Sequence, residues 1–148
     1  MPDKKNTIIL KIFLSCYVLA IVNSIIFKLV NEAFFYSNLT NPIETRPKYE
    51  QFILGVLLAP ILETWLFQFL PNRLLIRLKI YNQFLLILLP AVLFGAMHVE
   101  YSLLYGICML IFGLILNYFF LRAKDLSKHY FWLTVLLHMF YNMPGILI

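Results

Sequence analysis

Five long apolar runs, separated by short polar segments, constrain this chain more than any other feature of its sequence. They cover residues 7–30, 51–70, 82–99, 102–121 and 130–148. A helix needs about 20 apolar residues to cross the roughly 30 Å hydrocarbon core of a bilayer, and each run is near that length. We therefore predict an all-α protein, a polytopic bundle of about five transmembrane helices in a single membrane domain. Segment 31–50 has mixed charge and two prolines and is predicted to be an extracytoplasmic loop.

The composition excludes a soluble globule. Hydrophobic residues make up 62% of the chain and charged residues 13%, with a mean hydropathy of +0.84. Soluble domains average about 45–50% apolar and about 25% charged residues. The net charge of +5 does not indicate nucleic-acid binding, because the twelve Lys and Arg residues lie in small groups between apolar runs rather than in a basic stripe. The expected surroundings are a lipid bilayer.

The distribution of positive charge predicts the orientation. If the N-terminus is inside, only Lys28, Arg46 and Lys48 lie outside. The other nine are then cytoplasmic, namely Lys4, Lys5, Lys11, Arg73, Arg77, Lys79, Arg122, Lys124 and Lys128. Cytoplasmic loops of membrane proteins carry such an excess. We therefore predict a multi-pass protein with its N-terminus inside.

Prolines and glycines predict where helices end, bend and pack. Pro71 and the basic segment after it predict that the second membrane span ends at residue 70, where the chain could continue as an interfacial helical turn, and Pro90 predicts a kink in the third helix. Gly106 and Gly113 are seven residues apart, so they share one face of the fourth helix. That face is expected to approach a neighbouring helix closely.

Polar residues inside the apolar runs are the candidates for function. Glu63 is a lone carboxylate in its run, and an ionisable side chain in hydrocarbon costs roughly 2.5–3.5 kcal/mol on insertion scales. His98 and His138 interrupt two other runs, and Asn142 lies four residues after His138, on the same helix face. Each could be a structural hydrogen-bonding group on its own. Together, they supply the groups needed to activate water and stabilise an oxyanion.

Residue counting leaves one question of depth. At about 1.5 Å per residue, Glu63 and His138 lie at similar depth, whereas His98 lies roughly 10–15 Å shallower than Glu63. A third helix that starts earlier, or a second helix that continues past Pro71, would bring them level.

The three polar groups occur in ordered motifs. FGAMH contains Phe94 and His98, and HMFYN contains His138 and Asn142. Together with Glu63, these motifs resemble those of the CAAX-protease and bacteriocin-processing (CPBP, or Abi) family of intramembrane proteases. The family pattern is EExxxR, then FxxxH, then HxxxN or HxxxD. The resemblance covers about residues 50–145.

The first motif departs from this pattern. Glu63 matches the first glutamate, but Thr64 stands where a second glutamate is usual and Gln68 where arginine is usual. The two positions are four apart, so the family's charges can pair on one helix face. Thr64 and Gln68 are jointly neutral and could hydrogen-bond instead, which favours a structural change over a change in chemistry.

The resemblance implies a membrane-embedded endopeptidase that cleaves a peptide or protein substrate in or near a bacterial cytoplasmic membrane. Glu63 and His98 would orient and deprotonate water, and His138 and Asn142 would stabilise the tetrahedral intermediate. Phe94, Thr64 and Gln68 would support them. Prenylated CAAX proteins, bacteriocin leaders and signalling peptides are all compatible substrates.

Three alternatives stay open at this stage. Glu63, His98 and His138 could bind zinc, although H-E-x-x-H is absent and the chemistry does not require metal. The chain could be a catalytically silent family member that acts as an interaction or bacteriocin-immunity protein, which Thr64 and Gln68 favour. A haem-binding bundle with two axial histidines would leave Glu63 without a role.

Overall fold

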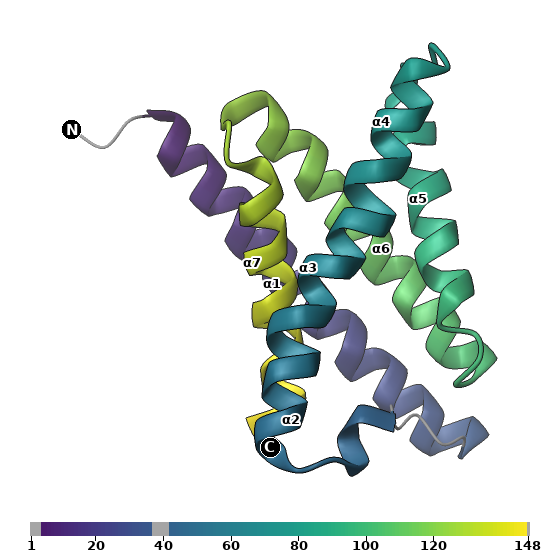
Figure 1. The fold of residues 1–148 in the computed structure, drawn as a ribbon. Coiled ribbons are helices and arrows are strands. Elements are labelled where there is room, and N and C mark those ends of the chain that lie inside the picture. Colours follow the sequence, from purple (N-terminus) through teal and green to yellow (C-terminus); the bar gives the residue numbers. More distant parts are fainter. Residues whose placement is uncertain (1–3, 37–41, 148) are drawn as a thin grey trace.

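The described residues of the computed structural model, 4–36 and 42–147, are almost entirely helical (Figure 1). The segments are α1 (Lys4–Val30), η1 (Asn31–Phe35), η2 (Pro42–Thr45), α2 (Lys48–Gln51), η3 (Phe52–Leu58), α3 (Ala59–Thr64), η4 (Trp65–Phe69), α4 (Leu70–Arg77), α5 (Gln83–Met97), α6 (Leu103–Leu126), α7 (Tyr130–Asn142) and α8 (Pro144–Leu147). No strand occurs within these ranges. The predicted all-α fold is confirmed.

Several of these segments join into continuous helices. Lys4–Phe35, Lys48–Arg77 and Leu103–Leu126 are long and apolar enough to cross a membrane. Helix α5 is apolar but shorter, and α7 has 13 residues. The chain reverses direction between successive runs, so that the N-terminus, the end of α4 and the α6–α7 connection share one end of the molecule (Figure 1). The result is a helical membrane bundle.

The second helix continues past Pro71, where its membrane span was predicted to end, and runs from Lys48 to Arg77. Both of its prolines follow a π-helical segment: Pro60 comes after η3 and Pro71 after η4. A proline ring clashes with the carbonyl four residues earlier and has no N–H to donate. The wider turn of a π-helix, which bonds residues five apart, accommodates both the ring clash and the missing N–H, so the helix continues.

The first helix also extends further than predicted. Segment η1 continues α1 to Phe35, where Tyr36 adopts a left-handed conformation and ends the run. The predicted loop 31–50 therefore shortens to the segment between Phe35 and Lys48, of which residues 37–41 lie outside the described part of the chain.

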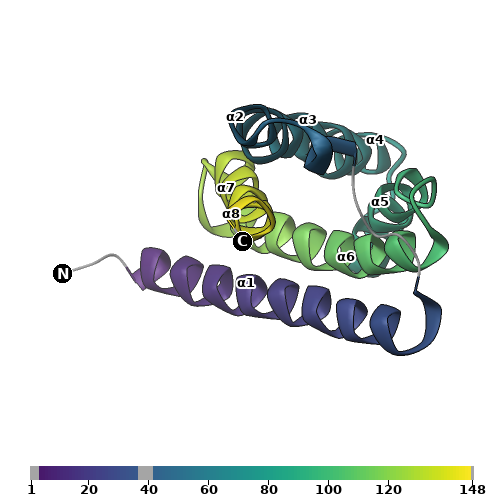
Figure 2. The ribbon, with the colours of Figure 1, turned by 90° about the horizontal axis from the view of Figure 1, so that it is seen from below.

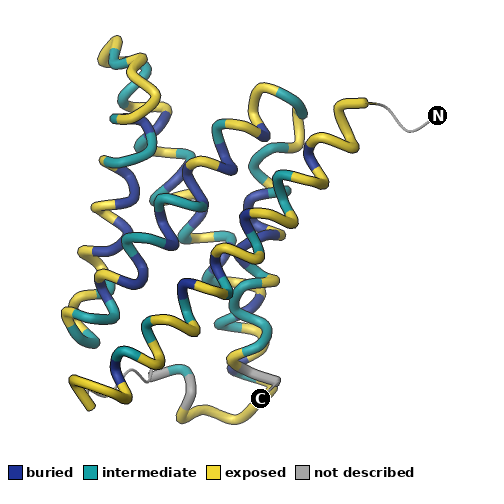
Figure 3. The backbone as a smooth tube through the Cα atoms, turned by 180° about the vertical axis from the view of Figure 1, so that it is seen from behind, coloured by how far each residue is buried: buried dark blue, intermediate teal, exposed yellow. Residues whose placement is uncertain are grey.

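Helices α2–α4, α5, α6 and α7 form a ring, and α1 lies outside it along α6 (Figure 2). Hydrogen bonds made by Asn23 and Ser24 attach α1 to the ring. The Asn23 amide donates to the Cys108 carbonyl at 3.0 Å, and the Ser24 and Tyr141 hydroxyls lie 2.7 Å apart. Apart from these contacts, α1 exposes mainly apolar side chains, such as Leu14 and Val18 (Figure 3). Such a surface suits contact with lipid.

The closest helix pair is the α5–α6 hairpin. A Cβ atom on Gly106 would lie 2.5 Å from the Val99 side chain, and one on Gly113 would lie 3.1 Å from the Cα of Ala91. The close approach predicted for this face of α6 is confirmed. Gly95 adds a third position on the facing helix, because its Cβ would lie 2.9 Å from the Gly106 carbonyl oxygen. Pro90 lies inside a continuous α5, so the kink stays a prediction.

Candidate active site

Glu63 faces His138 across the interface between the second helix and α7. The Glu63 Oε2 atom lies 3.5 Å from the His138 Nε2 atom. The side chain of His138 is 2% exposed and that of Glu63 is 26% exposed. The distance is longer than the usual 2.7–3.2 Å of an N–H···O hydrogen bond. Such contacts are often loose before substrate binds.

The rest of the His138 ring lies among aromatic side chains. The ring centroids of Phe112 and Phe94 are 5.2 and 6.0 Å away, both edge-on. The Nδ1 atom has no hydrogen-bond partner among the described residues. Glu63 is therefore the polar group toward which this imidazole is directed.

His98 caps the C-terminus of α5 and does not pair with Glu63. Its Nδ1 atom lies 2.7 Å from the Phe94 carbonyl oxygen. A carbonyl only accepts hydrogen bonds, so Nδ1 carries the proton and Nε2 is left as an acceptor. Within the described ranges, no ion pair of 4.0 Å or less joins His98 to Glu63. Among the described residues, the histidine within ion-pair distance of Glu63 is His138.

Phe94 connects the two histidines. Its buried ring lies 4.6 Å from the His98 ring and 6.0 Å from the His138 ring, centroid to centroid. Of the two arrangements considered for the depth of His98, the structure has the second helix that continues past Pro71.

Asn142 binds the backbone of the second helix. Its Nδ2 atom donates to the Gly55 carbonyl oxygen at 2.8 Å. In the π register of η3, the Ala59 N–H bonds to the Leu54 carbonyl, so residue 60 would bond to Gly55. Residue 60 is proline and has no N–H. Asn142 supplies the missing donor and leaves one of its two N–H groups for other partners.

Thr64 and Gln68 face the interior but lack partners. Both side chains are 0% exposed. The hydroxyl oxygen of Thr64 and both amide atoms of Gln68 have no hydrogen-bond partner within the described chain. The hydrogen bonds that could replace the family's ion pair are therefore not formed among the described residues.

Two further buried amides, Asn72 and Asn117, extend this polar region, and they were not predicted from the sequence. The Asn72 amide donates to the Gln68 carbonyl at 3.0 Å and to the Asn117 side-chain oxygen at 3.2 Å, and Asn117 donates to the Gly113 carbonyl at 2.9 Å. Thr64, Gln68 and Asn72 are four residues apart, a spacing that places them on one helix face. The sequence did not reveal this four-residue spacing as one helix face, because the second span was expected to end before Asn72.

Tyr101 is a further residue near the candidate site that was not predicted from the sequence. It lies in the α5–α6 turn, with its ring centroid 6.2 Å from that of His98. Burial raises the pKa of its phenol, and the charge of Glu100, a hydrogen bond to Glu100 and the charge of Glu63 raise it further. Tyr101 therefore stays neutral beside His98. Its position three residues after His98 is the one signal that could have identified it.

The donor set does not fit a zinc site. Catalytic zinc requires three protein ligands around an open position. Within residues 4–36 and 42–147, no group of three or more His, Cys, Asp or Glu side chains is arranged to hold a metal ion. Among the three proposed ligands, the contact of 4.0 Å or less that the structure shows joins Glu63 to His138.

The comparison with known families agrees with the geometry. Residues 45–144 match the model of the type II CAAX prenyl endopeptidase Rce1-like family. The chain belongs to this family. The match contains all four candidate residues, and it confirms the resemblance inferred from the three motifs. Rce1-like proteins are membrane proteases, so the chain is a member of a protease family and an integral membrane protein. No curated protein and no solved structure matches the chain significantly.

Proposed function

We propose that this protein is an intramembrane endopeptidase in which Glu63 activates the water that hydrolyses a peptide bond. The observation that carries the proposal is the 3.5 Å approach of Glu63 Oε2 to His138 Nε2 in an aromatic interior. A carboxylate held next to an imidazole, on separate helices, is an arrangement suited to general acid–base catalysis.

The reaction needs no covalent intermediate. Glu63 accepts a proton from water while the water oxygen bonds to the carbonyl carbon of the substrate. The resulting tetrahedral intermediate collapses as its C–N bond breaks, and Glu63 returns the proton to the leaving nitrogen. The products are a new carboxyl terminus and a new amino terminus.

The two histidines have different supporting roles. An N–H on His138 Nε2 can orient the Glu63 carboxylate at rest and donate to the developing oxyanion during attack. The Nε2 atom of His98, which lies beside the Tyr101 ring, can accept a hydrogen bond. Asn142 positions the second helix through Gly55, and its remaining N–H is available to an oxyanion.

The proposed location is a bacterial cytoplasmic membrane with the N-terminus inside. The end of the bundle that contains the N-terminus, the end of α4 and the α6–α7 connection holds the segments with most of the cationic residues (Figure 1). The proposed substrate is a peptide or protein that reaches the site from within or beside the bilayer.

The test compares the peptides produced in cells by the wild-type protein with those produced by a variant that lacks the Glu63 carboxylate. Membranes that contain the wild-type protein or Glu63→Gln are compared by mass spectrometry of protein termini. Termini that depend on the protease should fall about 10²–10⁴-fold in rate of appearance in the variant, the usual range for loss of a general base. Glu50→Gln is the matched control, because Glu50 lies on the same helix but pairs with Arg46 at the surface. Equal termini from wild type and Glu63→Gln would eliminate the proposed base.

One observation favours the alternative, a catalytically silent member that acts as an interaction or immunity protein. Thr64 and Gln68 replace the charged residues of the family motif and lack hydrogen-bond partners in the described chain. A silent member should keep its cellular phenotype in Glu63→Gln at an unchanged protein level. An endopeptidase should lose it.

A further inference from the structure

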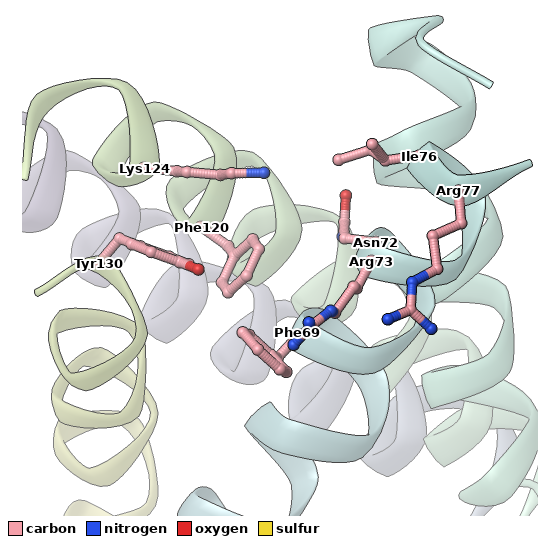
Figure 4. Close-up of a pocket in the computed structure, with 8 residues that line it drawn as sticks. All are labelled: Phe69, Asn72, Arg73, Ile76, Arg77, Phe120, Lys124 and Tyr130. Atoms are coloured by element: carbon pink, nitrogen blue, oxygen red, sulfur yellow. The ribbon is translucent and has the colours of Figure 1, made fainter. Parts of the chain in front are cut away.

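A cavity of about 300 Å³ lies between α4, the end of α6 and the start of α7, outside the candidate active site (Figure 4). Three cationic side chains line it: Arg73 and Arg77 from α4, and Lys124 from α6. No acidic residue is among its lining residues. The ammonium group of Lys124 extends across the cavity toward α4 (Figure 4).

The three cations that line the cavity carry like charge. Arg73 and Arg77 are four residues apart on one helix, and like charges at this spacing repel each other. Arg73 also lies over the ring of Phe69, with 5.9 Å between its guanidinium carbon and the ring centroid. No carboxylate of the described residues lies within 4.0 Å of the three cationic groups. A bound anion would remove this repulsion.

A buried amide at the base of the cavity provides an independent sign of a ligand. Asn72 is 1% exposed and lines the cavity. Its Nδ2 atom is used twice, by the Gln68 carbonyl and by Asn117, but its Oδ1 atom has no partner in the described chain. Figure 4 shows this oxygen directed toward the space below Lys124 and Ile76. A ligand with a hydroxyl group would supply the donor it lacks.

The position of the cavity points to a lipid. It lies where the two candidate spans Lys48–Arg77 and Leu103–Leu126 approach the same end of the bundle. The ends of helices that cross a bilayer lie near its polar headgroups. Phe69, Ile76 and Phe120 give it apolar walls beside the charged groups. Basic pockets between transmembrane helices are typical binding sites for anionic headgroups.

The geometry points to a binding site for the phosphate of an anionic phospholipid with a hydroxyl-bearing headgroup. Arg73, Arg77 and Lys124 bind the phosphate, and Asn72 Oδ1 accepts a hydrogen bond from a headgroup hydroxyl. The site does not depend on the proposed endopeptidase activity, because none of its residues belongs to the Glu63–His138 pair.

Binding of phosphatidylglycerol to the purified full chain in neutral detergent, titrated by native mass spectrometry, tests this site. We expect wild type to bind phosphatidylglycerol in preference to phosphatidylcholine. Neutralising one cation at a membrane surface weakens attraction to anionic lipid about fivefold. The triple variant Arg73→Gln, Arg77→Gln and Lys124→Gln should therefore bind about 100-fold more weakly.

The matched control removes three other cations predicted to lie at the same end of the bundle: Lys79→Gln, Arg122→Gln and Lys128→Gln. It should keep wild-type affinity. Lys124→Gln alone changes an exposed position and leaves the Arg73–Phe69 contact intact. Its affinity for phosphatidylglycerol should fall about fivefold, by the same estimate. Circular dichroism verifies that each variant keeps its helices.

Three outcomes would overturn the assignment. Wild type with no preference for phosphatidylglycerol over phosphatidylcholine would contradict it directly. Equal weakening in the two triple variants would indicate a general surface charge effect. Inorganic phosphate that binds the lipid-free chain as tightly as phosphatidylglycerol does would make a free anion the ligand.

Discussion

At the scale of single residues, Asn142 shows how the same side chain acquires a second role from its neighbours. Its spacing from His138 suggests a group that stabilises an oxyanion. In the folded protein it also donates to Gly55 at 2.8 Å, next to a proline that cannot donate. Asn142 thus joins α7, which contains His138, to the helix that contains Glu63.

We expect Asn142→Leu to destabilise the protein by about 1–3 kcal/mol, because the Gly55 carbonyl loses a hydrogen bond inside the bundle. Unfolding in mild detergent measures this loss. Asn23→Leu is the control, because it also removes an amide-to-carbonyl bond between helices, from α1 to Cys108. If activity falls in Asn142→Leu but persists in Asn23→Leu at similar stability, Asn142 positions the active site. Equal activity in the two variants would argue against that role.

Replacing Gln68 by an apolar residue should have the opposite effect on stability. Both of its amide atoms are buried without a partner in the described chain, so Gln68→Met, of similar size, should stabilise the protein by about 1–2 kcal/mol. Asn72→Leu should destabilise it, because the Asn72 amide makes two hydrogen bonds. Thermal unfolding of the two variants distinguishes them. Lower stability of Gln68→Met would mean that a group outside the described chain satisfies this amide.

At the scale of elements, the second helix combines two prolines with two π-helical segments. The π segments let the helix continue from Lys48 to Arg77, and thereby extend the polar face from Glu63 to Asn72. Segments of this kind occur frequently at functional sites. In this chain, η3 and η4 flank α3, the short segment that contains Glu63.

This geometry predicts that Pro60 and Asn142 are energetically coupled. Pro60→Ala provides a backbone N–H that can bond to the Gly55 carbonyl, so Asn142→Leu should cost about 0.5–1.5 kcal/mol less in that background. A double-mutant cycle on unfolding free energies measures the difference. In the control cycle, Pro71→Ala and Asn142→Leu should be additive, because Pro71 follows a different π segment. Additivity in both cycles would contradict the proposed role of the proline.

At the scale of the whole molecule, packing between α5 and α6 depends on close backbone contact. Gly95, Gly106 and Gly113 allow α5 and α6 to touch. Helix α6 also supplies much of the buried core, including Phe112, Leu116 and Phe119. In a membrane, small residues at such contacts allow helices to associate through van der Waals packing.

Gly95→Ala should therefore destabilise the bundle by about 1–3 kcal/mol, the usual cost of overpacking. Its Cβ would lie 2.6 Å from that of Leu110 and 2.9 Å from the Gly106 carbonyl oxygen, so backbone must move. Gly145→Ala is the control, because nothing lies within 4 Å of the added atom. Unfolding in detergent compares the two. Equal stability would mean that α5 and α6 are less tightly packed than the structure indicates.

The sequence by itself determined the helical membrane class, the approximate helices and the family. Each of these depends on information that is local along the chain: hydropathy over about 20 residues and motifs of five or six residues. The same local information identified Glu63, His98, His138 and Asn142 as candidates, since a polar residue in an apolar run is visible without a structure.

Only the tertiary structure decided how these candidates are partnered. Whether Pro71 ends a helix depends on whether a π segment absorbs its missing N–H, and hydropathy contains no such information. Whether His98 or His138 faces Glu63 depends on the rotation and depth of α5 and α7, which packing against neighbouring helices determines. The cationic cavity has the same origin, because Arg73 and Lys124 are far apart in sequence and meet only when α4 and α6 pack into one bundle.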